Sequence, residues 1–401
     1  MDVAGISVKD KGATGDGVTD DALAFQAALD SGFARIVVPF GTYLIGQGLL
    51  IGSDTELIIH PHARIKFGDG AGQGDTDFLL TNRDHTDGNS NILIAGGVWD
   101  GNNPGNTRGP DRPGSYTGVM LNFTNVKGLT LRKLRLLDAE SYFIRLGRVS
   151  NFLIERIAFE INNLRPNQDG VHVSGHCEDG IIRGLSGVGA MAPNDDLAAL
   201  LADDALERAQ NQNGAFNGPI RRIRVEHLRA TSCHSFVRLL SVDHPIEDVE
   251  IHDVEGGCRC CAINMDACRD CRVKLFKDAD RPDGVGMLSN IRVADMNVHK
   301  ASDSSHQPLI DFRTHADNFR IERFARNAAL DVSPDTPTLH IAQAGGVRVK
   351  LEGLAETVAG ETCGLLVTPT GQTVTLARDL TGQDSLTLAR GGFDKLTVDR
   401  A

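Results

Sequence analysis

Three aspartates and one histidine stand directly before short apolar runs in the middle of the chain. Asp169 precedes "GVHV", Asp195 and Asp196 precede "LAALL", and His234 precedes "SFVRLL". Cleavage of a glycosidic bond needs a proton donor for the leaving oxygen and a carboxylate that activates water or attacks the sugar. Carboxylates held close together repel one another, so the pKa of one rises and that group can keep its proton near neutral pH. These residue types therefore suit acid–base chemistry if the fold gathers them.

The apolar runs belong to a repeated pattern of two short alternations, each typical of a β-strand with one buried face. The first type ends at residues 131, 154, 182, 225 and 251, in steps of 23, 28, 43 and 26 residues. Its members are "GLTL" (128–131), "NFLI" (151–154), "DGII" (179–182), "RIRV" (222–225) and "DVEI" (248–251). The second type comprises "FIRL" (143–146), "GVHV" (170–173), "LAALL" (197–201), "FVRLL" (236–240), "AINM" (262–265) and "LIDF" (309–312).

A repeat of this length, with several strands and almost no helix, predicts an all-β fold, a parallel β-helix. Its coils stack about 4.8 Å apart, so equivalent positions on neighbouring coils line up. We therefore expect the acids and the histidine to gather at one edge of one sheet. The 43-residue step predicts an excursion, which "DDALERAQNQNGAFNG" (203–218) fits with a short helical run and polar, Gly-containing chain. It is either a plain surface loop or a flap beside the site.

The chain is expected to form a single domain over residues 1–401. Residues 1–34 form an N-terminal cap, 35–325 the coils with the catalytic cleft, and 326–401 further coils or a β extension. A solenoid exposes strand edges at its ends, which need covering. "TDDALAFQAALD" (19–30) predicts a short capping helix, and its apolar stripe consists of Ala22, Phe25, Ala28 and Leu29.

The composition of the chain limits which classes of binding partner are expected. A net charge of -12 argues against nucleic acid, which needs clustered Lys and Arg. No run of 18 apolar residues appears, so no membrane span is expected, and no signal peptide is visible at the N-terminus. The expected location is the cytoplasm, or outside it if a leader was removed. The expected partner is a carbohydrate, a homo-oligomer is compatible with the sequence, and no cofactor is predicted.

Eight cysteines occur, five of them in "CRCCAINMDACRDC" (258–271). That spacing does not match a standard zinc pattern. We interpret them as buried thiols in a reducing compartment, with a metal site or a disulfide as the alternatives.

Two stretches near the N-terminus resemble a known family. "KGATGDGVTDDALAFQAAL" (11–29) followed by "VPFGTYLI" (38–45) is similar to the opening of pectin-degrading β-helix proteins. It resembles glycoside hydrolase family 28, the polygalacturonases, and also the openings of phage tailspikes and some lyases. "GGVWDGNN" (96–103) resembles the G-G-x-x-D-G-x-G turn of the polygalacturonases. The resemblance implies a right-handed parallel β-helix of the pectin lyase-like type.

The catalytic pattern of that family is N-x-D, then D-D, G-H-G and R-I-K on later coils. Asn167-Gln168-Asp169 matches the first motif, Asp195-Asp196 the second, and His234 keeps the histidine of the third. The resemblance implies that Asp195 is the general acid, that Asp169 and Asp196 hold the water, and that His234 orients an acid. At the fourth motif the chain reads "CCAINMDA", with Asn264 near that place. Since the family's Arg-Lys pair holds a substrate carboxylate, a substrate other than plain polygalacturonate is expected.

A second row of polar residues follows from the alternation. The central residues of five runs are Arg145, His172, Arg238, Asn264 and Asp311, and their apolar neighbours must point inward. With Asn167, the first four of these are the predicted substrate-binding residues. The two arginines could hold a carboxylate or sulfate on a sugar, and the alternative is a solvated sheet face. Loops 82–91 and 102–118 are expected to wall the cleft. Trp99 or Tyr116 could stack on a sugar, although core packing is the safer default for a single aromatic.

The sequence thus predicts a glycoside hydrolase, polygalacturonase-like and inverting, that acts on a polysaccharide or oligosaccharide, acidic pectin-like ones included. A polysaccharide lyase is one alternative, with the acids on Ca²⁺ and Arg145 or Arg238 as the base; an intramolecular sugar transferase is another. A third is a non-catalytic, tailspike-like glycan-binding module. Fold alone does not separate these functions.

Overall fold

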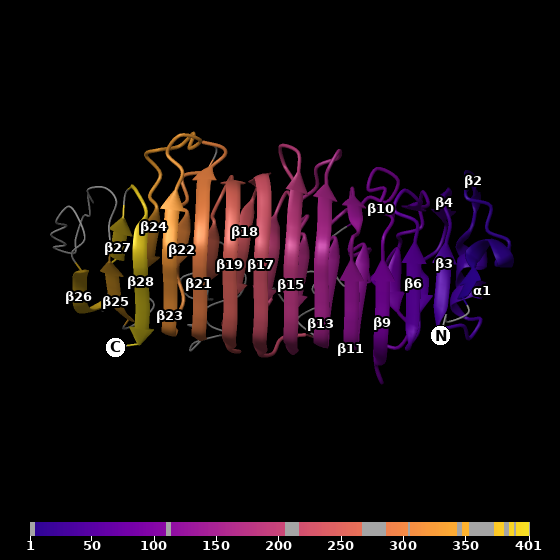
Figure 1. Ribbon diagram of the computed structural model, residues 1–401, viewed down its shortest axis with the longest axis horizontal. Helices are drawn as coiled ribbons and strands as arrows, with labels where there is room; N and C mark the ends of the chain where they lie inside the picture. The colour runs from indigo at the N-terminus through magenta and orange to yellow at the C-terminus, as the bar shows by residue number, and fades with distance from the viewer. Residues whose placement is uncertain are drawn as a thin grey trace.

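In the computed structural model the chain winds into coils that stack along one axis, with the two termini towards opposite ends (Figure 1). The structure describes residues 5–109, 114–204, 216–266, 286–303, 305–342, 347–352, 373–380, 385–388 and 390–400. The architecture is a right-handed parallel β-helix of the pectin lyase-like type, as the sequence predicts.

Three parallel sheets run the length of the solenoid. The site sheet contains β5 (Leu49–Ile51), β8 (Leu80–Asn82), the first parts of β11 (Leu121–Arg132) and β13 (Ile144–Glu160), β14 (Val171–Ser174), β16 (Asp196–Leu201), β18 (Ser235–Leu240), β20 (Ile263–Asp266), β22 (Ile310–Phe312) and β24 (Leu339–Ala342). The second sheet contains β1 (Gly5–Ser7), β3 (Arg35–Val38), β6 (Thr55–Ile59), β9 (Asn89–Ala95), the middle of β11 and β13, β15 (Cys177–Val188), β17 (Ile220–Cys233), β19 (Ile246–Cys258), β21 (Leu288–Lys300) and β23 (Ala316–Arg326).

The third sheet begins with β2 (Asp16–Asp20), β4 (Thr42–Ile45), β7 (Arg64–Phe67), β10 (Val98–Asp100) and β12 (Arg135–Leu137), and continues in the last residues of the long strands.

After β24 the pairing changes from parallel to antiparallel. The strands involved are β25 (Val347–Glu352), β26 (Thr373–Leu380), β27 (Ser385–Leu388) and β28 (Phe393–Arg400). Because β28 pairs with β23 and β27 pairs with β24, this β extension covers the last parallel coil.

The predicted coil register is confirmed residue by residue. The last residues of the first type of alternation are successive register partners in the second sheet: Leu131, Ile154, Ile182, Val225 and Ile251. The 43-residue step lies between β15 and β17 and contains β16 and the expected excursion. The helical run predicted there falls mostly on residues 205–215, outside the described residues.

Each long strand bends between the second and third sheets at one residue in the left-handed conformation. These corner residues have φ between 54° and 67°. They are Lys133, Arg156, Gly184, His227, Asp253, Asp295 and Arg323. The left-handed conformation costs roughly 1–2 kcal/mol for a residue other than glycine. The corner is nevertheless repeated on every long coil, because strand pairing on both sides of it holds the backbone in place.

The inward side chains of the three sheets form one continuous apolar core. The predicted capping helix is confirmed as α1 (Ala22–Leu29), after the 3-10 turn η1 (Val8–Lys11), and it lies at the N-terminal end (Figure 1). Its four predicted apolar residues are all buried.

Trp99 and Tyr116 are buried core residues too, so neither offers a ring face to a sugar. No helix among the described residues has the length and apolarity to cross a membrane.

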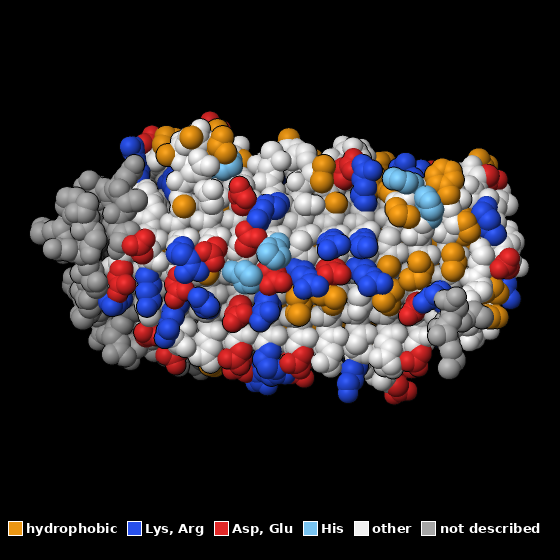
Figure 2. All heavy atoms as spheres, in the orientation of Figure 1, with side chains coloured by type: hydrophobic (Ala, Val, Ile, Leu, Met, Phe, Trp, Pro, Cys, Tyr) orange, Lys and Arg blue, Asp and Glu red, His pale blue; other side chains and the backbone are white. Residues whose placement is uncertain are grey.

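Opposite charges cover the outer face of the second sheet (Figure 2). Many of them form ion pairs between neighbouring coils, such as Arg224 with Glu250 at 3.2 Å and Arg292 with Glu322 at 2.9 Å. An exposed pair of this kind contributes little by itself, about 0–1 kcal/mol. Their regular spacing follows from the register, since each pair joins residues one coil apart.

Gly180 tests how tightly the coils stack. A Cβ atom on Gly180 would lie 2.0 Å from the ring of Phe152 on the preceding coil, whereas a Cβ on Gly52 would meet nothing within 4 Å. We expect Gly180→Ala to lower the free energy of unfolding by about 1–3 kcal/mol, because core overpacking costs that much. The control Gly52→Ala should change it by less than about 0.5 kcal/mol. Urea denaturation measures both, and equal effects would contradict the close packing of Phe152 against Gly180.

Candidate functional site

Three neighbouring strands of the site sheet, β14, β16 and β18, gather the predicted acids and histidine. Val171, Ala198 and Val237 are successive register partners. The turns that lead into the strands are aligned as well: Gly170 N–H donates to the Asp196 carbonyl at 2.8 Å, and Asp195 N–H donates to the Gln168 carbonyl at 3.2 Å. Asp169, Asp195, Asp196 and His234, here called the site cluster, therefore lie together at the edge where these strands begin.

His234 is the centre of the outer part of the site cluster. Its Nδ1 lies 3.3 Å from Asp195 Oδ1 and 3.9 Å from Asp196 Oδ1. Burial acts to lower the pKa of His234, but hydrogen bonds with Asp195, Asp196 and Cys260 outweigh it and raise the pKa to about 12. His234 is therefore an imidazolium at neutral pH. The side chains of His234 and Asp195 are 36% and 24% exposed, so both are accessible to a ligand.

The inner part of the site cluster consists of two buried carboxyl groups. Burial and the charge of Asp195 raise the pKa of Asp169 to about 7, against the hydrogen bond with His172, which acts to lower it. Burial and the same neighbouring charge also raise the pKa of Asp196. A carboxyl group whose pKa is near 7 can give and take a proton under physiological conditions. The site cluster thus contains one buried acid, Asp169, that can exchange a proton near neutral pH behind the solvent-accessible carboxylate of Asp195.

His172 connects Asp169 to a further acid, Asp204. Its Nδ1 lies 2.6 Å from Asp169 Oδ2 and its Nε2 lies 3.0 Å from Asp204 Oδ2. The ring of Tyr142 stacks on the imidazole, with centroids 3.8 Å apart. Burial acts to lower the pKa of His172, but the hydrogen bonds to Asp169 and Asp204 outweigh it and raise the pKa to about 9. A buried imidazolium therefore holds two buried carboxyl groups in place.

Asp203 and Asp204 fix the start of the excursion to the site sheet. Asp203 Oδ2 accepts hydrogen bonds from the backbone of Val242, Asp243 and His244 at 2.7–3.0 Å. At the other end of the excursion, Asn217 Oδ1 accepts the Asp204 N–H at 3.1 Å. The sequence placed this pair of aspartates at the start of an insertion. Its alternation did not reveal that Asp204 reaches back to His172.

The predicted polar row lies in one register column of the site sheet, with Ala199 between His172 and Arg238. Its side chains point away from the core as predicted, but most of them are buried rather than open to solvent. The buried members are Arg145, His172, Asn264 and Asp311. Arg145 is covered because Phe216, at the end of the excursion, lies over its guanidinium at 4.8 Å. Phe216 therefore stands between Arg145 and solvent, and a role of Arg145 in holding a sugar carboxylate stays a prediction.

Arg238 is the partly open member of the row, with a side chain 19% exposed. Its Nη2 donates to Asp266 Oδ2 at 2.9 Å, and Asn264 Nδ2 donates to the same oxygen at 3.1 Å. Sequence reasoning did not single out Asp266, although it stands two residues after Asn264 and so shares its face of the strand. Asn167 lies in the turn before β14, half-buried, where its Oδ1 accepts a 3.4 Å hydrogen bond from Arg108.

Asp195, Asp196 and His234 could also hold a metal ion, since one ligand atom from each lies within 4.8 Å of the others. A histidine must be neutral to bind a metal. The imidazolium form of His234 already explains why the two carboxylates approach it. Five cysteines among the described residues are buried: Cys177, Cys233, Cys258, Cys260 and Cys261. Cys268, Cys271 and Cys363 lie outside the described residues.

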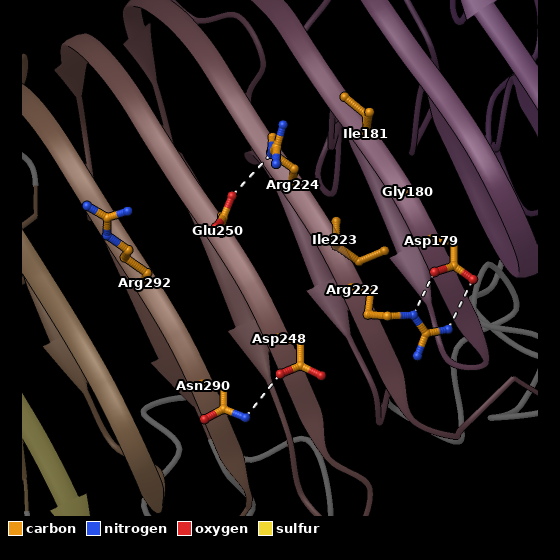
Figure 3. Close-up of a pocket in the computed structure, with 10 residues that line it drawn as sticks. All are labelled: Asp179, Gly180, Ile181, Arg222, Ile223, Arg224, Asp248, Glu250, Asn290 and Arg292. Carbon is orange, nitrogen blue, oxygen red and sulfur yellow. Dashed lines mark hydrogen bonds and ion pairs between the residues drawn. The ribbon is translucent and has the colours of Figure 1, made fainter.

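A shallow depression of about 500 Å³ lies elsewhere, on the second sheet, across β15, β17, β19 and β21 (Figure 3). Its polar residues contact one another in pairs, including the ion pair of Arg222 with Asp179 at 2.6 Å and the hydrogen bond from Asn290 to Asp248 at 3.0 Å. This depression does not include the site cluster, which stands on the site sheet. The accessible ion pair and the raised carboxyl pKa values make the site cluster the better candidate for chemistry.

Comparisons with known proteins agree on the fold. The family profile described as "Rhamnogalacturonase A/epimerase, pectate lyase-like" matches residues 5–98. The pre-neck appendage protein of Bacillus phage phi29 is 45% identical over 101 residues, which are 25% of this chain and 12% of the phage protein. The chain thus matches about an eighth of the length of that relative. The plasmin- and fibronectin-binding protein A of Streptococcus pneumoniae is 27% identical over 163 residues, 39% of this chain and 20% of the relative.

The family 28 exopolygalacturonase of Yersinia enterocolitica superimposes with a TM-score of 0.55 at 14% identity, over 80% of this chain and 72% of the enzyme. The chain therefore has the pectate lyase-like β-helix fold, which carbohydrate-active enzymes share. The resemblance to glycoside hydrolase family 28 holds at the level of the fold. Relatives with matching sequences include a phage appendage protein and a bacterial binding protein.

The pH dependence of stability tests the His172 bridge. Because the pKa of His172 rises from 6.5 to about 9 on folding, its stabilising contribution is complete below pH 6.5 and is lost as the pH rises through about 9. We expect His172→Asn to be less stable than the wild type at pH 6. The difference in unfolding free energy should shrink by about 2–3 kcal/mol between pH 6 and pH 9.5. The control is the exposed His62→Asn, and a wild-type to His172→Asn difference that stays constant with pH would disprove the bridge.

Proposed function

We propose that the chain is a glycan-recognition module that holds a carbohydrate against the site sheet, in a surface appendage or adhesin. The observation that carries the proposal is the partly exposed polar group formed by Asp195, His234 and Arg238 on adjoining coils. Carbohydrate-binding surfaces need such fixed polar groups, and a rigid sheet holds them in place. The sequence relatives support the biological setting, since one is a phage pre-neck appendage protein and another is a bacterial protein that binds plasmin and fibronectin.

Glycoside hydrolysis is the second candidate, and the raised pKa values of Asp169 and Asp196 favour it. In this mechanism Asp195, the most exposed carboxyl group of the site cluster, first takes up a proton from solvent and then donates it to the leaving oxygen, the role that the resemblance implies. Asp169 and Asp196 hold the attacking water, as the resemblance implies. His234 keeps Asp195 oriented through their 3.3 Å contact. Inversion requires the two working carboxyl groups to lie about 6.5–9.5 Å apart, with room for water between them.

A panel of acidic and neutral glycans separates the two candidates when binding and products are measured together. Affinity electrophoresis reports retention, and reducing-end and ultraviolet assays report cleavage. A recognition module retains a glycan without releasing reducing ends, and Asp195→Asn changes its affinity by less than about tenfold. A hydrolase releases reducing ends, and Asp195→Asn lowers turnover by about a hundredfold or more while retention persists.

Glu250→Gln is the matched control, because it removes one carboxylate from the second sheet and leaves the site cluster intact. Failure to retain any glycan of a broad panel would refute the recognition proposal. Unsaturated products that absorb in the ultraviolet, formed only without a chelator, would instead select a calcium-dependent lyase.

A further inference from the structure

We infer that this face takes an uncharged glycan rich in hydroxyl groups and discriminates against chains of uronic acids. The inference rests on the proposed glycan recognition and names its ligand class. Its basis is that the arginines beside the site cluster already donate hydrogen bonds to acceptors of the protein. A sugar carboxylate bound in a protein needs strong donors, usually an arginine with available N–H groups.

The two arginines that open onto this face each hold a buried aspartate. Arg238 donates to Asp266 at 2.9 Å, and Arg313 Nε donates to both oxygens of Asp311 at 2.9 Å. Asp266 and Asp311 are 2% and 0% exposed. If a sugar carboxylate drew either arginine away, a buried aspartate would lose its guanidinium partner, which is unfavourable even where a second group remains, as His340 does at Asp311.

Two more arginines contact the turns that carry the site cluster, at Gln168 and Asn194, and are also engaged. Arg165 Nε donates to Glu140 at 2.9 Å. Arg259 donates to the Ser232 carbonyl and to both side-chain and main-chain oxygens of Asn194. An anionic sugar would therefore compete with existing partners at four positions of this face, and it would also meet the partly exposed carboxylate of Asp195.

Buried acceptor atoms on β20 point to a donor ligand. Asn264 Oδ1 and Asp266 Oδ1 are buried and have no hydrogen-bond partner within the part of the chain that the structure describes. An unsatisfied buried acceptor costs free energy, which a donor recovers. A hydroxyl group donates, directly or through a bridging water, whereas a carboxylate only accepts. The hydroxyl groups of a sugar therefore match this part of the site sheet, whereas the additional carboxylate of a uronate does not.

The test measures, by affinity electrophoresis, how strongly the full chain is retained by neutral polysaccharides and by polygalacturonate of matched length. We expect the wild type to retain a neutral polymer at least about tenfold more strongly than polygalacturonate, the factor for one charge-assisted hydrogen bond. Retention of the neutral polymer should change less than about twofold between low and high salt, since no ion pair with the ligand is screened.

The decisive variant is Asp266→Asn, which removes the ion pair between Arg238 and Asp266. It should strengthen polygalacturonate retention by about tenfold, a gain that a merely damaged fold does not produce. Asp311→Asn removes the ion pair between Arg313 and Asp311 and is the second test variant if Asp266→Asn fails to fold. Glu250→Gln, which releases Arg224 on the second sheet, should leave polygalacturonate retention unchanged.

The outcomes keep the two proposals apart. If no glycan is retained, the recognition function itself fails. If glycans are retained but the wild type prefers polygalacturonate, or if retention falls steeply with salt, glycan recognition stands and the neutral-ligand inference is overturned.

Discussion

The register between neighbouring coils is the constraint on which the whole molecule depends. Parallel strands about 4.8 Å apart can pair only when equivalent residues lie side by side, and a slip of one residue would turn every buried side chain outward. The column from Leu131 to Ile251 shows that this register continues across the excursion. It brings Asp169, Asp196 and His234 together although 65 residues separate the first from the last.

Stacking in register has an electrostatic consequence, because it places like charges beside one another. On the second sheet water screens them and ion pairs alternate between coils. On the site sheet the acids are buried, so their charges must be balanced by protons or by buried cations. Two imidazolium groups, His172 and His234, supply that balance, and the pKa values of Asp169 and Asp196 rise. Arg238 balances the charge of the buried Asp266 in the same way, so its guanidinium is already engaged when an anion approaches the site.

The fold and the site cluster answer different questions about function. The β-helix is shared by an exopolygalacturonase and by a surface adhesin of Streptococcus pneumoniae, so the fold allows both cleavage and binding. The site cluster has the components of acid–base chemistry, whereas the sequence relatives are appendage and binding proteins. Both functions need the same contact with a glycan, and they differ in whether a proton reaches a leaving oxygen.

The sequence by itself determined the strands, the capping helix and the neighbours in each column, because alternation decides which side chains are buried and the repeat length decides which positions stack. It could therefore predict that Asp169, Asp195, Asp196 and His234 meet. Only the tertiary structure decided how accessible and how charged they are, since those properties depend on residues from other segments. Phe216 returns from the excursion to cover Arg145, Asp204 reaches back to His172, and Asp266 holds Arg238 from the next coil. Such contacts have no periodic signal in the sequence, because each is made once, between segments whose spacing does not repeat.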